Sequence, residues 1–212
     1  AEREAIFLRL GLAQEWEPVE SVPPSVAYNN RVEPGVNPLV ALEELPVRVL
    51  LAELPASDRG AALDVGSGHG RWVPHLQELG FEVTAVDVAR AAMRDSPTTR
   101  RVVGDGRRLP IADCTQAVVL LSFVLTHFPN LREALEEVAR VLVPGGLCVT
   151  ADMHARTVEL FGVEPYRQRS GRVGAVVDYV HEVGEYWDAC RGAGLDLHAL
   201  VEVPWTEESA AE

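Results

Sequence analysis

Apolar residues recur along the chain with two different spacings. Over residues 38–54 they fall three or four positions apart, which predicts an amphipathic helix that Pro46 should bend or divide. Residues 61–65 form a short continuous apolar run that closes on glycines, and residues 72–79 return to helical spacing. This order predicts a strand, a glycine turn and a helix.

The alternation of strand and helix patterns continues to residue 152. Gly145 and Gly146 are expected to end the last helix of this region before its last strand. Short buried strands that alternate with helices predict an α/β fold, a Rossmann-like, doubly wound, mostly parallel sheet with helices on both faces. The expected strands are residues 81–88, 101–103, 117–123 and 147–152, and the expected helices are residues 89–94 and 131–142.

The two ends of the chain have weaker patterns. Strands are expected at residues 176–180 and 195–203, with a helix at residues 185–193 between them. The chain is therefore divided into four parts. They are an N-terminal arm and helices that form a lid (1–54), a ligand-binding core (55–152), a substrate-side cap with the final helix and strand (153–204), and a polar tail (205–212).

Charge and composition narrow the classes of partner. The 212 residues include 19 Lys+Arg against 32 Asp+Glu, a net charge of −13, and every basic residue is arginine. Such an acidic surface repels phosphate backbones and anionic lipid, so we expect neither nucleic acid nor a membrane as partner. The absence of lysine excludes a phosphate-loop lysine and Schiff-base chemistry. The sequence also lacks a signal-like start, a long apolar run and paired-cysteine spacing, so a cytoplasmic protein is expected.

Acidic residues lie near the ends of the first three strands of the core. Residues 66–70 have the spacing G-x-G-x-G, which differs from the G-x-G-x-x-G of dinucleotide-binding turns. Asp64 precedes this turn, Asp87 ends the second strand, and Asp105 follows the third strand. At its position Asp87 can accept hydrogen bonds from both hydroxyl groups of a ribose. Three carboxylates around one pocket disfavour a polyphosphate and suit a ligand that carries positive charge and a ribose.

These motifs, taken in order with residues 131–147, resemble those of class I S-adenosylmethionine-dependent methyltransferases. The resemblance spans residues 55–152, and a looser one links the flanking segments to bacterial small-molecule methyltransferases of secondary metabolism. It implies that Asp87 binds the ribose, that Asp105 and Gly106 hold the adenine edge, and that the fourth strand ends near the cofactor amine and sulfonium. The expected S-adenosyl-L-methionine-binding residues are Asp64, Gly66, Ser67, Gly68, Gly70, Asp87, Val88, Gly104, Asp105, Gly106, Ser122, Phe123 and, as a lid, Tyr28.

Histidines are the candidate bases for methyl transfer to a hydroxyl group. His154 follows the strand at residues 147–152, and His181 follows the strand expected at residues 176–180. His127 follows the fourth strand, a position that in the family shapes the pocket wall more often than it removes a proton. No pair of histidines has the spacing of metal ligands on a helix, so no metal is expected.

The sequence leaves several alternatives open. A small, natural-product-like acceptor is expected, with methylation of oxygen or nitrogen favoured and of carbon possible. The competing functions are an NAD(P)-dependent oxidoreductase and a non-catalytic nucleotide-binding regulator, and the protein is expected to be a monomer or a homodimer. Arg107 and Arg108 are interpreted as solvated surface residues that offset the acidic excess.

Overall fold

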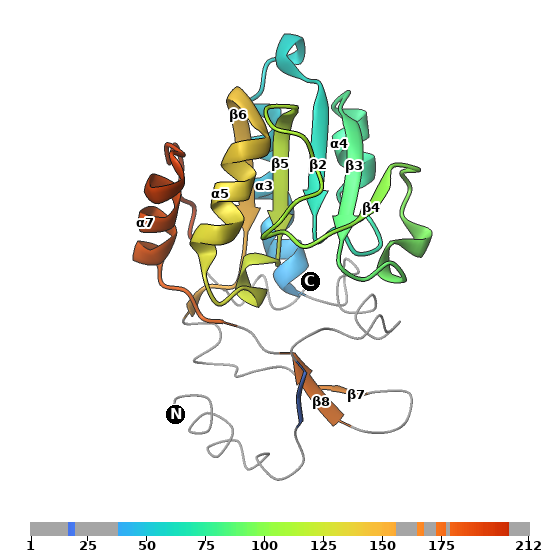
Figure 1. Cartoon of the computed structure of the whole chain (residues 1–212), viewed down its shortest axis with the longest axis vertical. Helices are drawn as coiled ribbons and strands as arrows, with labels where there is room; N and C mark the ends of the chain where they lie inside the picture. Colours follow the sequence, from blue (N-terminus) through green and yellow to red (C-terminus); the bar gives the residue numbers. More distant parts are fainter. Residues whose placement is uncertain (1–16, 20–37, 156–164, 168–172, 177–178, 204–212) are drawn as a thin grey trace.

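A five-stranded parallel sheet forms the centre of the molecule (Figure 1). The structure is a computed structural model, and it describes residues 17–19, 38–155, 165–167, 173–176 and 179–203. The chain order reverses between β2 and β5, and ligands of open parallel sheets bind at the carboxyl ends of the strands beside such a reversal. In spatial order, the strands are β4 (Arg101–Val103), β3 (Glu82–Asp87), β2 (Ala61–Val65), β5 (Gln116–Ser122) and β6 (Leu142–Ala151).

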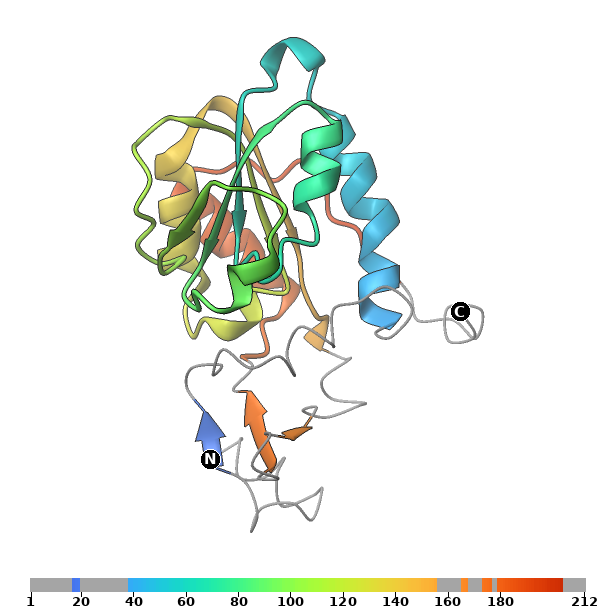
Figure 2. The ribbon, with the colours of Figure 1, turned by 90° about the vertical axis from the view of Figure 1, so that its right-hand side faces the viewer.

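Helices cover both faces of this sheet (Figure 2). Helices α3 (Pro38–Ala52) and α4 (Val73–Glu78) lie on one face, and α5 (Leu131–Val141) and α7 (Val183–Ala193) lie on the other. Each face of the sheet has its own hydrophobic core. Successive residues of a strand pack into the two cores alternately, because their side chains point to opposite faces. Ala62 packs in the cluster with α3 and α4, whereas Leu63 packs in the cluster with α5. The predicted fold class is confirmed.

Of the bend or division expected at Pro46, the division is absent, because α3 runs as one helix across it. Two other local expectations were wrong in detail. Residues 89–94 were expected to form a helix, but the observed element is the short 3-10 turn η2 (Ala92–Asp95). Helix α5 ends before the glycines expected to stop it, because Leu142 is already extended (φ −68°, ψ 139°) and pairs with Gln116 as the first residue of β6.

The strand expected at residues 195–203 does not form. These residues have no regular structure, and Leu200 and Val201 are 51% and 55% exposed. Alternating apolar residues supply a face for a core, but a strand also needs a neighbouring backbone to pair with. The strand expected at residues 176–180 is displaced, since β8 ends at Val176.

A second, small sheet joins segments from distant parts of the sequence. Strand β8 (Val173–Val176) pairs in parallel with β1 (Glu17–Val19) and antiparallel with β7 (Pro165–Arg167). Both views place it beyond the carboxyl ends of the main strands (Figures 1 and 2). A segment of the N-terminal arm therefore lies beside the last third of the chain. None of the helices in the described ranges is long and apolar enough to cross a membrane.

Candidate functional site

The glycine turn between β2 and α4 lies at the carboxyl edge of the sheet. Gly66, Gly68 and Gly70 have φ values of +66°, +52° and +83°, a region that side chains with a Cβ rarely adopt. A Cβ at Gly66 would lie 2.2 Å from Cγ2 of Val124, so this glycine allows close packing. A Cβ at Gly68 would meet no heavy atom within 4 Å. The backbone of Gly68 therefore borders open space that a ligand can enter.

Asp87, the last residue of β3, is hydrogen-bonded to this turn. Its Oδ2 accepts from the Gly68 amide at 2.9 Å, and its Oδ1 accepts from the Ala89 amide at 2.7 Å. Burial raises the pKa of Asp87, while the two amides and the nearby His127 act in the opposite direction. Each carboxylate oxygen keeps a second lone pair. The fixed carboxylate fits the two hydroxyls of a ribose, and the adjacent Val88 is 61% exposed beside it.

Asp64 lies beneath the turn rather than on its surface. Its side chain is buried and accepts a hydrogen bond from the Ser67 hydroxyl at 2.6 Å. Burial raises the pKa of Asp64 to about 7, although the Ser67 hydrogen bond opposes the shift and the Asp87 charge adds to it. In this structure, the hydrogen bond between Ser67 and Asp64 stabilises the turn from its buried side.

The segment after β4 forms the next part of the edge. Gly104 packs against Pro110, whose Cδ would lie 2.6 Å from a Cβ at this position. Gly106 is buried against Phe128, so a Cβ there would approach the ring to 3.0 Å. The carboxylate of Asp105 accepts hydrogen bonds from the Arg107 side chain at both oxygens, at 2.7–3.2 Å.

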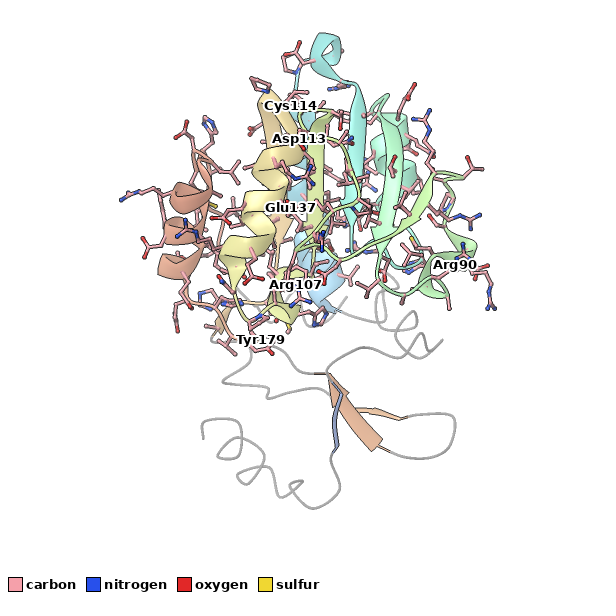
Figure 3. The ribbon with its side chains drawn as sticks, in the orientation of Figure 1. Arg90, Arg107, Asp113, Cys114, Glu137 and Tyr179 are labelled. Carbon is pink, nitrogen blue, oxygen red and sulfur yellow. The ribbon has the colours of Figure 1, made fainter. Side chains whose placement is uncertain are left out.

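Arg107 is exposed and paired with an acidic residue, as expected, and it also belongs to this edge. Its guanidinium holds Asp105 and lies 5.6 Å from the centre of the Phe128 ring. The hydrogen bond from Arg107 lowers the pKa of Asp105. Arg107 and Tyr179 both lie at the end of the molecule that faces the small sheet, whereas Asp113 and Cys114 lie at the opposite end (Figure 3).

Ser122 ends β5 and Phe123 follows it directly, beside the glycine turn. Phe123 has φ +53°, a conformation that costs free energy for a non-glycine residue and is concentrated at functional sites. The Ser122 hydroxyl takes part in a cluster that the sequence did not reveal. It accepts from Arg71 Nη2 at 2.9 Å and donates to the Glu43 carboxylate at 2.9 and 3.0 Å, while Arg71 also pairs directly with Glu43.

The three candidate histidines do not converge on one point. His181 is buried, and its Nε2 lies 2.8 Å from the Phe128 carbonyl oxygen, to which it can only donate. His154 is exposed after β6, with Nε2 3.0 Å from Oε1 of Glu202. His127 ends the turn η3 (Leu125–His127) and interacts electrostatically with Asp87. Their catalytic roles stay predictions.

The remaining expectations concern Tyr28 and metal binding. Tyr28 lies outside the described residues. Across the described ranges, no group of three or more His, Cys, Asp or Glu residues is arranged to hold a metal ion. Of the residues that sequence reasoning missed, only Arg71 carried a signal, because it follows the last glycine of the turn directly. Glu43 lies in a distant helix and carried none.

Comparison with known proteins identifies the central part of the chain. Residues 63–150 match the family described as "Methyltransferase domain". The biotin biosynthesis bifunctional protein BioHC of Cellvibrio japonicus is 36% identical over 103 residues, which cover 46% of this chain and 20% of that protein. A demethylmenaquinone methyltransferase of Corynebacterium glutamicum is 33% identical over 103 residues, which cover 47% of this chain and 44% of that protein. The chain thus spans less than half the length of either relative.

Solved structures agree on the fold. An S-adenosylmethionine-dependent methyltransferase from Mesorhizobium loti superposes with a TM-score of 0.58 at 19% identity, covering 72% of this chain and 80% of that one. The match over residues 63–150 and the shared fold support the predicted class I methyltransferase domain, whose predicted cofactor is S-adenosylmethionine. The residues present fit this cofactor, because a fixed carboxylate and open space above Gly68 adjoin the turn. The match does not favour the oxidoreductase alternative.

Proposed function

We propose that the protein transfers a methyl group from S-adenosylmethionine to a small, natural-product-like acceptor, because residues 63–150 match a methyltransferase domain. The observation that carries the proposal is the hydrogen bond between the Gly68 amide and Asp87, which joins the glycine turn to the acidic end of β3. Bound S-adenosylmethionine supplies a methyl group activated by its sulfonium. The chain itself has to bind and orient the cofactor and the acceptor, and it has to exclude water from them.

The binding residues lie at the ends of neighbouring strands, and each contacts a different part of the cofactor. Asp87 accepts hydrogen bonds from the ribose hydroxyls. Asp105 and the backbone of Gly106 face the adenine edge. Arg107 keeps the Asp105 carboxylate in place through its two-point hydrogen bonding. Ser122 and Phe123 border the methionyl and sulfonium end. These assignments rest on the positions of the residues along one edge of the sheet.

His154 is the candidate base for a hydroxyl acceptor. It follows β6 at the carboxyl edge, and the Glu202 carboxylate at 3.0 Å fixes the orientation of its ring. His181 is less suited to this role, because it is buried and its Nε2 donates to the Phe128 carbonyl, whereas His154 is exposed. Oxygen or nitrogen is the favoured acceptor atom. A hydroxyl group needs a base to remove its proton, whereas positioning alone can suffice for an amine.

A small acceptor is supported by charge, by the cap and by one relative. The net charge of −13 opposes binding to nucleic acid. The small sheet of β1, β7 and β8 lies beyond the carboxyl edge, where a cap would enclose a small molecule. One relative is named for demethylmenaquinone, which is itself a small molecule. The three free cysteines fit a reducing compartment, so we place the reaction in the cytoplasm.

Two measurements test this function. Isothermal titration should show binding of S-adenosylhomocysteine and none of NAD, and the reverse result would overturn the proposal. Transfer of a labelled methyl group from S-adenosylmethionine should then be measured with panels of phenols, carboxylic acids and amines, with bulk transfer RNA for comparison. Labelling of the RNA alone would refute the small-molecule acceptor.

A further inference from the structure

Helix α3 carries apolar side chains on opposite sides. Val40, Val47 and Leu51 are buried, and the last two pack in the hydrophobic core on this face of the sheet. On the outer side of the helix, Leu45 and Val49 are 70% and 55% exposed. A helix that is apolar all round is normally buried all round. Within the described ranges the outer side of α3 is uncovered, although its composition suits an interface.

The exposed side chains form one line along the helix. Val49 lies four residues after Leu45, and Leu42 lies three residues before it, so the three side chains share a face. We call Leu42, Leu45 and Val49 the outer stripe of α3. Figure 2 shows α3 as the outermost described helix on its side of the sheet. The outer stripe is therefore accessible to another molecule.

An acid and a base border the outer stripe on the side of α4. Oε1 of Glu44 accepts a hydrogen bond from Nε of Arg48 at 3.0 Å, and Nη1 of Arg48 lies 2.6 Å from Nδ1 of His75 in α4. The side chains of Arg48 and Glu44 are 42% and 39% exposed. Both charges can therefore reach a molecule that lies on the stripe.

The order of these charges is self-complementary. Glu44 lies two residues before Pro46, and Arg48 lies two residues after it. Two α3 helices that cross antiparallel at Pro46 therefore place each Glu44 level with Arg48 of the other copy, whereas a parallel crossing would place like charges together. A two-fold symmetric interface requires such self-complementarity, because the same patch is used by both copies.

We propose that the outer stripe of α3 binds the same stripe of a second copy of this chain, antiparallel and around a two-fold axis near Pro46. The contact buries Leu45 and Val49 of both copies and pairs Glu44 of each with Arg48 of the other. The net charge of −13 opposes association elsewhere, so a contact needs a locally balanced surface. An interface of one helix from each copy is small, so we expect a reversible dimer with a Kd on the order of 10 μM.

This pairing leaves the cofactor site of each copy open. Helix α3 runs lengthwise beside the strands (Figure 2), so antiparallel copies place their carboxyl edges at opposite ends of the dimer. The inference does not depend on the proposed function.

The test uses sedimentation equilibrium of the full chain at about 1–100 μM, a range that brackets the expected Kd. The unaltered protein should show a monomer–dimer equilibrium. Glu44→Arg and Arg48→Glu should each weaken the dimer by about tenfold or more, because like charges then meet across the two-fold axis.

A mixture of the two single variants tests the geometry itself. One variant carries two positive charges beside the stripe and the other carries two negative ones, so an equimolar mixture should form a heterodimer with a Kd within about threefold of the original. This recovery also shows that both variants fold. The matched control is Arg132→Glu or Glu136→Arg, an exposed pair with the same spacing on α5, which should leave the dimer unchanged.

Three results would overturn the inference. The first is an unaltered protein that stays monomeric up to about 100 μM. The second is a dimer that Glu44→Arg and Arg48→Glu do not weaken, or that the control variants weaken equally. The third is a mixture of the two single variants that fails to associate.

Discussion

Replacing Gly66 with alanine should destabilise the protein through one identifiable contact. The new Cβ would lie 2.2 Å from Cγ2 of Val124, and Cγ1 and Cβ of that residue would be at 3.2 and 3.3 Å. Rotating the valine would move Cγ2 but not Cβ, so a tight contact at 3.3 Å would remain. An alanine also pays about 1 kcal/mol for the left-handed conformation, here φ +66°. Overpacking a core adds about 1–3 kcal/mol, which brings the expected loss to about 2–4 kcal/mol.

The assay is thermal and chemical unfolding followed by circular dichroism. For a domain of this size, 1 kcal/mol corresponds to about 2–4 °C in Tm, so Gly66→Ala should lower it by about 5–15 °C. Val124→Ala alone should cost about 1–3 kcal/mol through lost burial. Combined, the two changes should cost about 1–3 kcal/mol less than their sum, because the second removes the atoms that the first strikes. Additivity within about 0.5 kcal/mol would refute this account of the turn.

Four further predictions follow from the site. Gly68→Ala should cost about 1–2 kcal/mol for its left-handed conformation, here φ +52°. It should also weaken binding of S-adenosylhomocysteine in calorimetry, because its Cβ enters the open space over the turn; unchanged affinity would mean that no ligand approaches there. Asp87→Asn should weaken binding of the same ligand by about tenfold, because one acceptor for the ribose and the turn becomes a donor. An unchanged Kd would contradict this role of Asp87. With its folded pKa near 7 and an unfolded value near 3.9, Asp64 binds more protons folded than unfolded between these limits, so it destabilises the protein as pH rises through this window. Asp64→Asn should therefore gain stability relative to the unaltered protein from about pH 4 to 7 in urea titrations, and a gain independent of pH would contradict the shift. His154→Gln should abolish methylation of hydroxyl acceptors while S-adenosylhomocysteine still binds, and full turnover would exclude it as the base.

Pattern and spacing predicted the core well because the relevant forces act locally. Strands β2, β3 and β5 were expected within one or two residues of their observed bounds, since each is a short run bounded by turn residues. The strand at residues 195–203 was wrong for a different reason. Its alternation is real, yet a strand forms only with a backbone partner, and periodicity carries no information on that.

The site divides in the same way. Gly66, Gly68 and Asp87 could be found from the sequence, because the turn needs residues without a Cβ and the strand end fixes where the acid lies. Arg107 is exposed and paired with an acid as the sequence predicted, whereas its position over the Phe128 ring depends on how two loops meet. The contact with the ring is therefore decided by a residue distant in the chain.

The sequence by itself determined the parallel sheet and the glycine turn and indicated the class of cofactor, because hydrophobic period, glycine conformation and the order of motifs are properties of neighbouring residues. Only the tertiary structure decided which charges meet. Glu43 and Ser122 are joined with Arg71 although one lies in α3 and the other at the end of β5. Burial then makes that meeting matter, because a charge removed from water must be matched by a partner that the fold, and not the local sequence, supplies.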